Sequence, residues 1–233
     1  RVERDEFRRL AAMRNVGLEF PGSLGIGFIS RVDREELDAF IEWVRSDGAP
    51  GFEVRTSGDF DDLMVITYLE PVEGNEPAIG FDIGQESRRR LAAEEAARTG
   101  RITLTEPLEL VQDTLKTKGF LILQPVYFTG APITSEEERL AALMGWVYMP
   151  LRAAEMFAGV SALSGGELRF AVFAGEDRSE SSLIYESGGA GKGWSLEPTP
   201  SMGVKRLEVA GRKWTMVTRE TAATVADALI AAG

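Results

Sequence analysis

Apolar residues recur at the spacing of a helical face in several stretches of this chain. The clearest stretch covers residues 32–46, where the apolar positions from Leu37 to Val44 form one face. Asp33 and Glu36 stand at its start with the spacing of a capping box, which predicts where this helix begins. Helices are predicted in this way at residues 1–15, 32–46, about 85–98, 135–145, 151–158 and 221–232.

Runs rich in Val, Ile, Phe and Tyr separate these helices and predict strands. The run at 119–128 is dense in apolar residues, which is typical of a strand in the centre of a sheet. Strands are predicted at residues 25–29, 52–54, 64–69, 102–104, 119–128, 145–149, 168–174, 183–185, 204–209 and 214–217. Because helices and strands are mixed without strict βαβ alternation, we predict an α+β fold with antiparallel sheets and a domain boundary within residues 150–165.

The length of 233 residues and the apolar content of 44% suit a folded chain with a sizeable core. A formal net charge of -11 argues against a nucleic-acid partner, because such binding needs clustered Lys and Arg that release counterions. The acidic residues are spread along the chain, as on an ordinary solvated surface.

The sequence contains no Cys and no His. This excludes thiol nucleophiles, disulfides, Ser-His-Asp triads and the usual zinc sites, and no loop has the Asp spacing of an EF-hand. The Gly-rich run at 188–193 does not fit a phosphate-binding loop, because Glu186 stands where the first Gly is needed and Gly193 replaces the Ser or Thr. We therefore predict no catalytic residue, no metal and no cofactor.

No window of about 18 apolar residues is present, and no signal peptide is visible. Both ends of the sequence fall within predicted helices, so we expect the chain to be a piece of a longer protein. The absence of Cys fits a bacterial envelope compartment.

Residues 70–128 have a recognisable order of parts: an extended run, a loop with Asn and Pro, Gly80-Phe81-Asp82, an Ala-rich helix closed by Gly100, and two further strands. Other segments follow in a matching order, namely residues 18–31 leading into 33–44, GWVYMPLRAAEMFAG at 145–159, and Gly211-Arg212-Lys213-Trp214. Together these features resemble the CHASE domain. This domain is the extracytoplasmic sensor region of receptor histidine kinases and of nucleotide and diguanylate cyclases, including plant cytokinin receptors.

The resemblance implies a long N-terminal helix followed by two PAS-like domains. We therefore expect a stalk helix at residues 1–20, a membrane-distal ligand-binding domain at 21–150, a membrane-proximal domain at 151–218, and a C-terminal helix at 219–233 that leads to a transmembrane segment. It also implies flanking transmembrane helices in the full-length protein, a homodimer formed through the N-terminal helix, and a periplasmic position at the inner membrane.

The resemblance further implies a ligand site in the distal domain, because cytokinin receptors hold an adenine-type hormone there. In those receptors an Asp takes the purine edge, and a Thr after the Ala-rich helix lies in the pocket. Counting without gaps from Gly80-Phe81-Asp82 puts Glu73 at the Asp position, with Asn75 as an alternative, and Thr105 at the Thr position. Glu73 is Glu and not Asp, so an ordinary exposed loop acid is an equal alternative for it.

The predicted strand at 121–127 supplies walls for such a site. Its alternation puts Leu121, Leu123, Pro125 and Tyr127 on one face, and a small-molecule pocket needs apolar walls with a few convergent polar groups. The full predicted ligand-binding set is Glu73, Asn75, Phe81, Thr105, Leu123, Pro125 and Tyr127. The alternative is that the apolar members are simply core, which we expect for Leu121.

Two charged features are interpreted as structural. Asp82 precedes Gly84 and a helix, so we expect it to cap the helix and not to contact a ligand. Arg88-Arg89-Arg90 lies in the first turns of that helix, with Arg90 and Glu94 at i,i+4 spacing, so we expect a solvated face with local ion pairs.

The sequence thus predicts a sensor domain for a small organic molecule, adenine-like or cytokinin-like by resemblance, which is not itself an enzyme. The alternative is an envelope interaction or dimerisation module without a small-molecule ligand. An unfilled cavity lined by Glu73, Thr105 and Tyr127 favours the sensor, and packed side chains there favour the interaction module.

Overall fold

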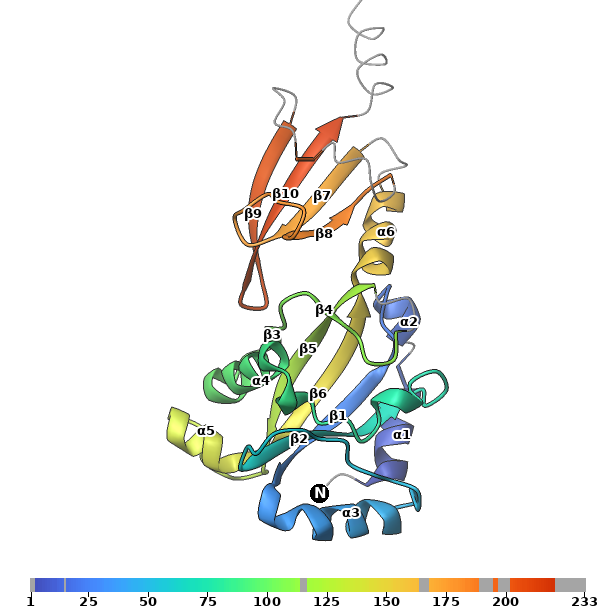
Figure 1. Ribbon diagram of the computed structural model, residues 1–233, viewed down its shortest axis with the longest axis vertical. Coiled ribbons are helices and arrows are strands. Elements are labelled where there is room, and N and C mark those ends of the chain that lie inside the picture. The colour runs from blue at the N-terminus through green and yellow to red at the C-terminus, as the bar shows by residue number, and fades with distance from the viewer. Residues whose placement is uncertain are drawn as a thin grey trace, which may run out of the picture. The chain divides into compact units, whose positions relative to one another are not determined.

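The computed structural model describes residues 3–14, 16–113, 117–163, 168–188, 195–196 and 202–220. The chain forms two compact units, unit 1 (Arg1–Arg152) and unit 2 (Ala153–Gly233), which are described separately (Figure 1). Both units mix helices with antiparallel sheets, which confirms the α+β prediction. The assignment of the two units as PAS-like domains stays a prediction.

Unit 1 is built around one antiparallel sheet with the strand order β2-β1-β6-β5-β3, and β4 also pairs with β5. Its strands are β1 (Ile26–Asp33), β2 (Asp62–Glu70), β3 (Thr103–Leu104), β4 (Leu108–Glu109), β5 (Lys118–Tyr127) and β6 (Leu143–Arg152). Its helices are α1 (Arg4–Ala12), α2 (Val16–Glu19), α3 (Leu37–Ser46), α4 (Ser87–Thr99) and α5 (Glu136–Ala142), with 3-10 turns η1 (Arg34–Glu36), η2 (Glu76–Ala78) and η3 (Ile83–Gln85).

Alternation along the strands gives this sheet two different faces. On the first face, Ile29, Leu123 and Trp146 pack in one cluster with the buried Ala residues of α4, and we call it the α4 face. Figure 1 shows α4 lying beside β3 and β5. On the second face, which we call the α3 face, Phe28 and Tyr68 pack with residues of α1 and α3.

Several local signals are confirmed. Ser135 and Glu138 form a capping box at the start of α5, with both hydrogen bonds present. Gly100 ends α4 in the left-handed region with φ 72°. Alanine in α4 suits its position, because small side chains let the helix backbone lie close to the sheet.

Other predictions are wrong. The helix expected over residues 1–20 is a nine-residue helix, Arg4–Ala12, followed by the separate short helix α2. The helix expected from Val32 starts only after β1, and Asp33 makes no capping hydrogen bond, because its backbone pairs with Asp62 in the sheet. The strand expected at 52–54 does not form, and the nearest pairing is an isolated bridge at Arg55.

Unit 2 contains α6 (Ala153–Leu163), β7 (Leu168–Ala174), β8 (Leu183–Glu186), β9 (Met202–Val209) and β10 (Arg212–Glu220), and its antiparallel sheet has the order β8-β7-β10-β9. Phe157 of α6 packs against the rings of Phe170, Tyr185 and Trp214, at centroid distances of 6.3, 5.4 and 5.8 Å. Because β10 continues to Glu220, residues 219 and 220 are strand and not helix. The helix predicted at 221–232 lies outside the described residues.

Candidate ligand-binding site

A row of residues crosses the sheet of unit 1 on the α4 face. Leu69, Gly27, Tyr148, Leu123 and Thr103 are successive cross-strand partners from β2 to β3. A Cβ atom on Gly27 would lie 2.3 Å from Cε1 of Tyr148. The absence of a side chain on Gly27 therefore leaves the space that the Tyr148 ring fills.

Three side chains of the sheet tie α4 to this layer. Trp146 Nε1, Thr103 Oγ1 and Tyr127 Oη each donate a hydrogen bond to a backbone carbonyl oxygen of α4, at 2.9, 2.7 and 2.7 Å. The acceptors are, in the same order, the carbonyl oxygens of Ala93, Ala92 and Ala97. The helix is therefore held in place by polar contacts as well as by apolar packing.

Five members of the predicted ligand-binding set belong to this layer. Thr105 and Leu123 are completely buried, and Pro125 is also buried. Phe81 and Tyr127 are half-buried and pack against the same core cluster. The structure therefore brings Leu123, Phe81 and Tyr127 together on the α4 face, and strand alternation places Thr105 and Pro125 on the same side.

The polar atoms of Thr105 are used within the sheet. Its Oγ1 accepts a hydrogen bond from the N–H of Leu121 at 3.0 Å, and its own N–H donates to the Leu121 carbonyl at 3.0 Å. Thr105 thus extends the pairing of β5 beyond the end of β3. Packed side chains around Thr105 and Leu123 correspond to the arrangement predicted for the interaction module.

The two loop residues proposed as polar anchors differ in burial. Glu73 is exposed, whereas Asn75 is only 3% exposed. Asn75 Nδ2 donates to the carbonyl oxygens of Leu24 and Pro71 at 2.8 and 2.9 Å, and two acceptors there fix the orientation of the amide. Within the part of the chain that the structure describes, Asn75 Oδ1 has no hydrogen-bond partner.

Tyr148 is a second residue with a buried polar atom that has no hydrogen-bond partner among the described residues, and the sequence predictions did not include it. Its side chain is 2% exposed, and its hydroxyl has no partner among the described residues. Burial raises the pKa of Tyr148, so the phenol stays protonated at neutral pH and can both donate and accept. Leu24, whose carbonyl accepts from Asn75, packs against the core cluster that contains Tyr148.

Alternation along residues 145–149 already places Tyr148 on the same face as Trp146. That signal indicates a buried aromatic residue, but it does not show that the hydroxyl lacks a partner. The partner across the strands, Gly27, is set by the pairing of β1 with β6, which are more than 100 residues apart in sequence.

Residues 1–185 match the CHASE domain family, which is well over half of the 233 residues. The chain belongs to the CHASE domain family. CHASE domains are extracytoplasmic sensor domains of signalling receptors and are not catalytic, which confirms the predicted family, the sensor role and the prediction that this chain is not an enzyme. No curated protein matches the chain.

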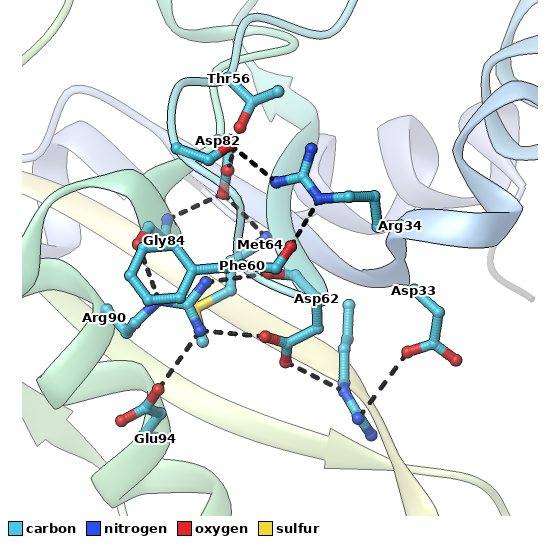
Figure 2. A network of polar contacts seen from close by, with 12 residues as sticks. Asp33, Arg34, Thr56, Phe60, Asp62, Met64, Asp82, Gly84, Arg90 and Glu94 are labelled. Atoms are coloured by element: carbon cyan, nitrogen blue, oxygen red, sulfur yellow. Dashed lines mark hydrogen bonds and ion pairs between the residues drawn. The ribbon is translucent and has the colours of Figure 1, made fainter.

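A buried polar network supports the segment between β2 and α4 of this CHASE domain (Figure 2). Asp82 is 1% exposed, and its Oδ1 accepts from the N–H groups of Met64 and Gly84, both at 2.9 Å. Its Oδ2 accepts from Thr56 Oγ1 at 2.7 Å. The contact with Gly84 caps η3, so the structural interpretation of Asp82 is confirmed.

Arg90 joins the same network from α4 (Figure 2). Its guanidinium donates to the Gly84 carbonyl at 2.7 Å and to Asp62 Oδ1 and O at 3.0 and 2.9 Å. It also reaches Glu94 at 3.3 Å, as the i,i+4 spacing predicts, and lies 4.0 Å from the ring centroid of Phe60. The side chain is only 10% exposed, so the prediction of a solvated face is wrong for Arg90.

Arg89 is buried for a similar reason. Its Nη2 donates to the Glu109 carbonyl at 2.6 Å, and its guanidinium lies 5.5 Å from the ring centroid of Phe81. Of the three arginines, Arg88 alone is exposed. Helical spacing identifies partners on the same helix, but not the distant segments that cover it.

The acidic residues of the described chain form no group of three or more that could hold a metal ion. None of the helices in the same parts of the chain has the length and apolar character needed to cross a membrane. The Gly-rich run falls largely on residues 189–194, which lie outside the described residues.

Two Tyr to Phe substitutions are expected to change stability in opposite directions. Tyr148→Phe removes a buried hydroxyl that has no partner in the described part of the chain, so we expect the free energy of unfolding to rise by about 1 kcal/mol. Tyr127→Phe removes the hydrogen bond to α4, so we expect a loss of about 0.5–1.5 kcal/mol. Urea unfolding of both variants measures the difference, and a destabilised Tyr148→Phe would show that the hydroxyl has a partner.

Proposed function

We propose that this CHASE domain senses a small organic molecule that binds in unit 1 on the α4 face of the sheet. The observation that carries the proposal is the presence of two buried polar atoms, Asn75 Oδ1 and Tyr148 Oη, that have no partner among the described residues and lie beside an apolar core. Leaving such a group unpaired costs about 1–3 kcal/mol, and buried polar groups are nearly always paired. A ligand that satisfies both atoms regains that free energy.

The chemistry of these atoms indicates the kind of ligand. Asn75 Oδ1 is an acceptor, so the ligand needs an N–H or O–H group, and the Tyr148 hydroxyl can meet either a donor or an acceptor. The exocyclic amine and ring nitrogens of adenine provide both kinds of group. Adenine-type molecules, including cytokinins, are therefore the first candidates, with the predicted residues Glu73, Phe81, Thr105, Leu123, Pro125 and Tyr127 as rim and walls.

Movement of the Tyr148 ring could couple ligand binding to a conformational change of the domain. It fills the space above Gly27, so a ligand enters this layer only when the ring moves. A ligand shifts the population between two conformations to the extent that it binds one of them better. In the proposed receptor that shift passes from a periplasmic homodimer through a transmembrane helix of the inner membrane to a histidine kinase or cyclase.

A thermal-shift screen against small metabolites, including adenine-type cytokinins, tests this proposal. A ligand present at about 100 times its dissociation constant stabilises the folded state by about 2.7 kcal/mol. We expect one compound class to raise the unfolding midpoint of the wild type and to raise that of Tyr148→Phe much less. Tyr127→Phe is the matched control, because its hydroxyl already has a partner.

Thr105→Ile is a less suitable variant for this test. The Leu121 N–H donates to Thr105 Oγ1, so Ile leaves that N–H unpaired and adds volume to a filled layer. A lost ligand response in this variant could then come from misfolding alone. Tyr148→Phe avoids this problem, because it removes one oxygen atom and no hydrogen bond to any described residue.

The packed side chains around Thr105 and Leu123 favour a second candidate, an interaction or dimerisation module of the envelope. This candidate predicts that no compound shifts the midpoint, even at concentrations where weak binders register. It also predicts a molar mass that rises with protein concentration in light scattering. A ligand response that depends on Tyr148 rejects it.

A further inference from the structure

A cavity of about 290 Å³ lies on the other side of the sheet in unit 1, on the α3 face. Five aromatic residues line it: Phe28, Phe40, Trp43, Tyr68 and Phe128. They come from β1, β2, α3 and the residue that follows β5, so the cavity is formed by segments far apart in the sequence. Its volume is close to the lower end of small-molecule pockets, about 300–1,000 Å³, which suits a small ligand.

Most polar groups at this cavity already have partners. Ser30 Oγ lies 2.7 Å from Thr67 Oγ1, and the Tyr68 hydroxyl donates to Asp47 Oδ2 at 2.8 Å. These contacts hold the walls in place, and the aromatic side chains supply apolar surface to the lining. Phe7 of α1 stacks on Tyr68 at a centroid distance of 5.4 Å and links the cavity wall to that helix.

Glu36 is the exception. It lines the cavity at the start of α3, is exposed, and makes no capping hydrogen bond to the helix. No basic side chain within the described ranges forms an ion pair with it. Its carboxylate is therefore available to a cation that enters the cavity.

Arg31 is the basic side chain among the described residues that line the cavity, and it does not offset this charge. Arg31 lies 3.4 Å from Asp62 and 3.8 Å from Asp33, and its Nη1 donates to the Leu140 carbonyl at 3.2 Å. Two carboxylates thus neutralise Arg31, so it does not supply a positive charge to Glu36.

We infer that this cavity is a second binding site, and that its ligand is a small organic cation with an apolar body, such as an aromatic amine or a quaternary ammonium compound. Ring faces carry partial negative charge and attract such cations. Glu36 supplies the counter-charge at the mouth, and the net charge of -11 favours cations in general. The inference is independent of the proposed function, because it concerns the opposite face of the sheet.

Isothermal titration at low salt with benzyltrimethylammonium tests this site, with uncharged benzyl alcohol as the comparison compound. We expect the wild-type domain to bind the cation more tightly than the alcohol. Glu36→Gln is expected to weaken cation binding by roughly three- to fivefold, the range of an exposed ion pair, and to leave alcohol binding unchanged. Added salt should likewise reduce the difference in affinity between the cation and the alcohol.

Glu35→Gln is the matched control, because Glu35 is the exposed neighbour of Glu36 on η1 and does not line the cavity. Trp43→Leu keeps an apolar wall without the ring face, and we expect it to weaken cation binding roughly fivefold or more. Equal effects of Glu35→Gln and Glu36→Gln would overturn the inference, because only overall charge would then matter. The inference would also be overturned if the wild-type domain bound the alcohol as tightly as the cation. It would be overturned as well if the folded domain bound no cation.

Discussion

Replacing Asp82 with Ala is expected to lower the free energy of unfolding of this CHASE domain by about 3–5 kcal/mol. The substitution leaves the N–H groups of Met64 and Gly84 and the hydroxyl of Thr56 without their acceptor. The site is almost fully buried, so water cannot easily replace the carboxylate. The loss should also loosen the segment between β2 and α4, which carries the proposed site residue Phe81.

Urea unfolding, followed by far-UV circular dichroism, measures this effect. Asp59→Ala is the matched control, because Asp59 is exposed, and we expect a change within about 0.5 kcal/mol. A loss below about 1 kcal/mol in Asp82→Ala would mean that the three donors find other acceptors, and that the network does not hold this segment.

Replacing Arg90 with Ala is expected to cost about 2–4 kcal/mol. The guanidinium holds the Gly84 carbonyl and both the backbone and the side chain of Asp62, and it covers the ring of Phe60 (Figure 2). Its removal leaves a half-buried carboxylate and two carbonyls with fewer partners. Chemical denaturation again provides the measurement.

Arg88→Ala is the control for Arg90→Ala on the same helix. Arg88 is exposed and pairs with Glu86 at 2.7 Å, so we expect its loss to cost about 1 kcal/mol or less. If the two variants lose the same stability, the buried network of Arg90 stabilises the domain no more than the exposed ion pair of Arg88 does.

Sequence patterns within a few residues correctly predicted where helices begin and end when only neighbouring residues decide it. The capping box at Ser135 and Glu138 and the left-handed Gly100 are formed within a few residues of chain, so their patterns were sufficient. Asp33 carried a similar pattern with Glu36, but its backbone pairs with Asp62 in the sheet. A strand partner 29 residues away therefore overrode the local preference, and the sequence pattern contained no information about it.

The candidate site shows the same limit. Alternation correctly placed Leu123 and Tyr127 on one face, because it needs only the strand itself. The position of the Tyr148 ring depends on Gly27, and the burial of Arg90 depends on Asp62, so both need contacts between distant segments. Resemblance to a family could not supply these contacts residue by residue.

Hydrogen–deuterium exchange of the domain, with and without the compound that gives the largest thermal shift, tests the central claim most directly. Binding on the α4 face predicts slower exchange in residues 72–81 and in β6, and no such slowing in Tyr148→Phe at the same compound concentration. Slower exchange confined to α3 and β1 would place the compound in the aromatic cavity, and slower exchange confined to unit 2 would place it outside unit 1. Either result would contradict the proposed sensor site.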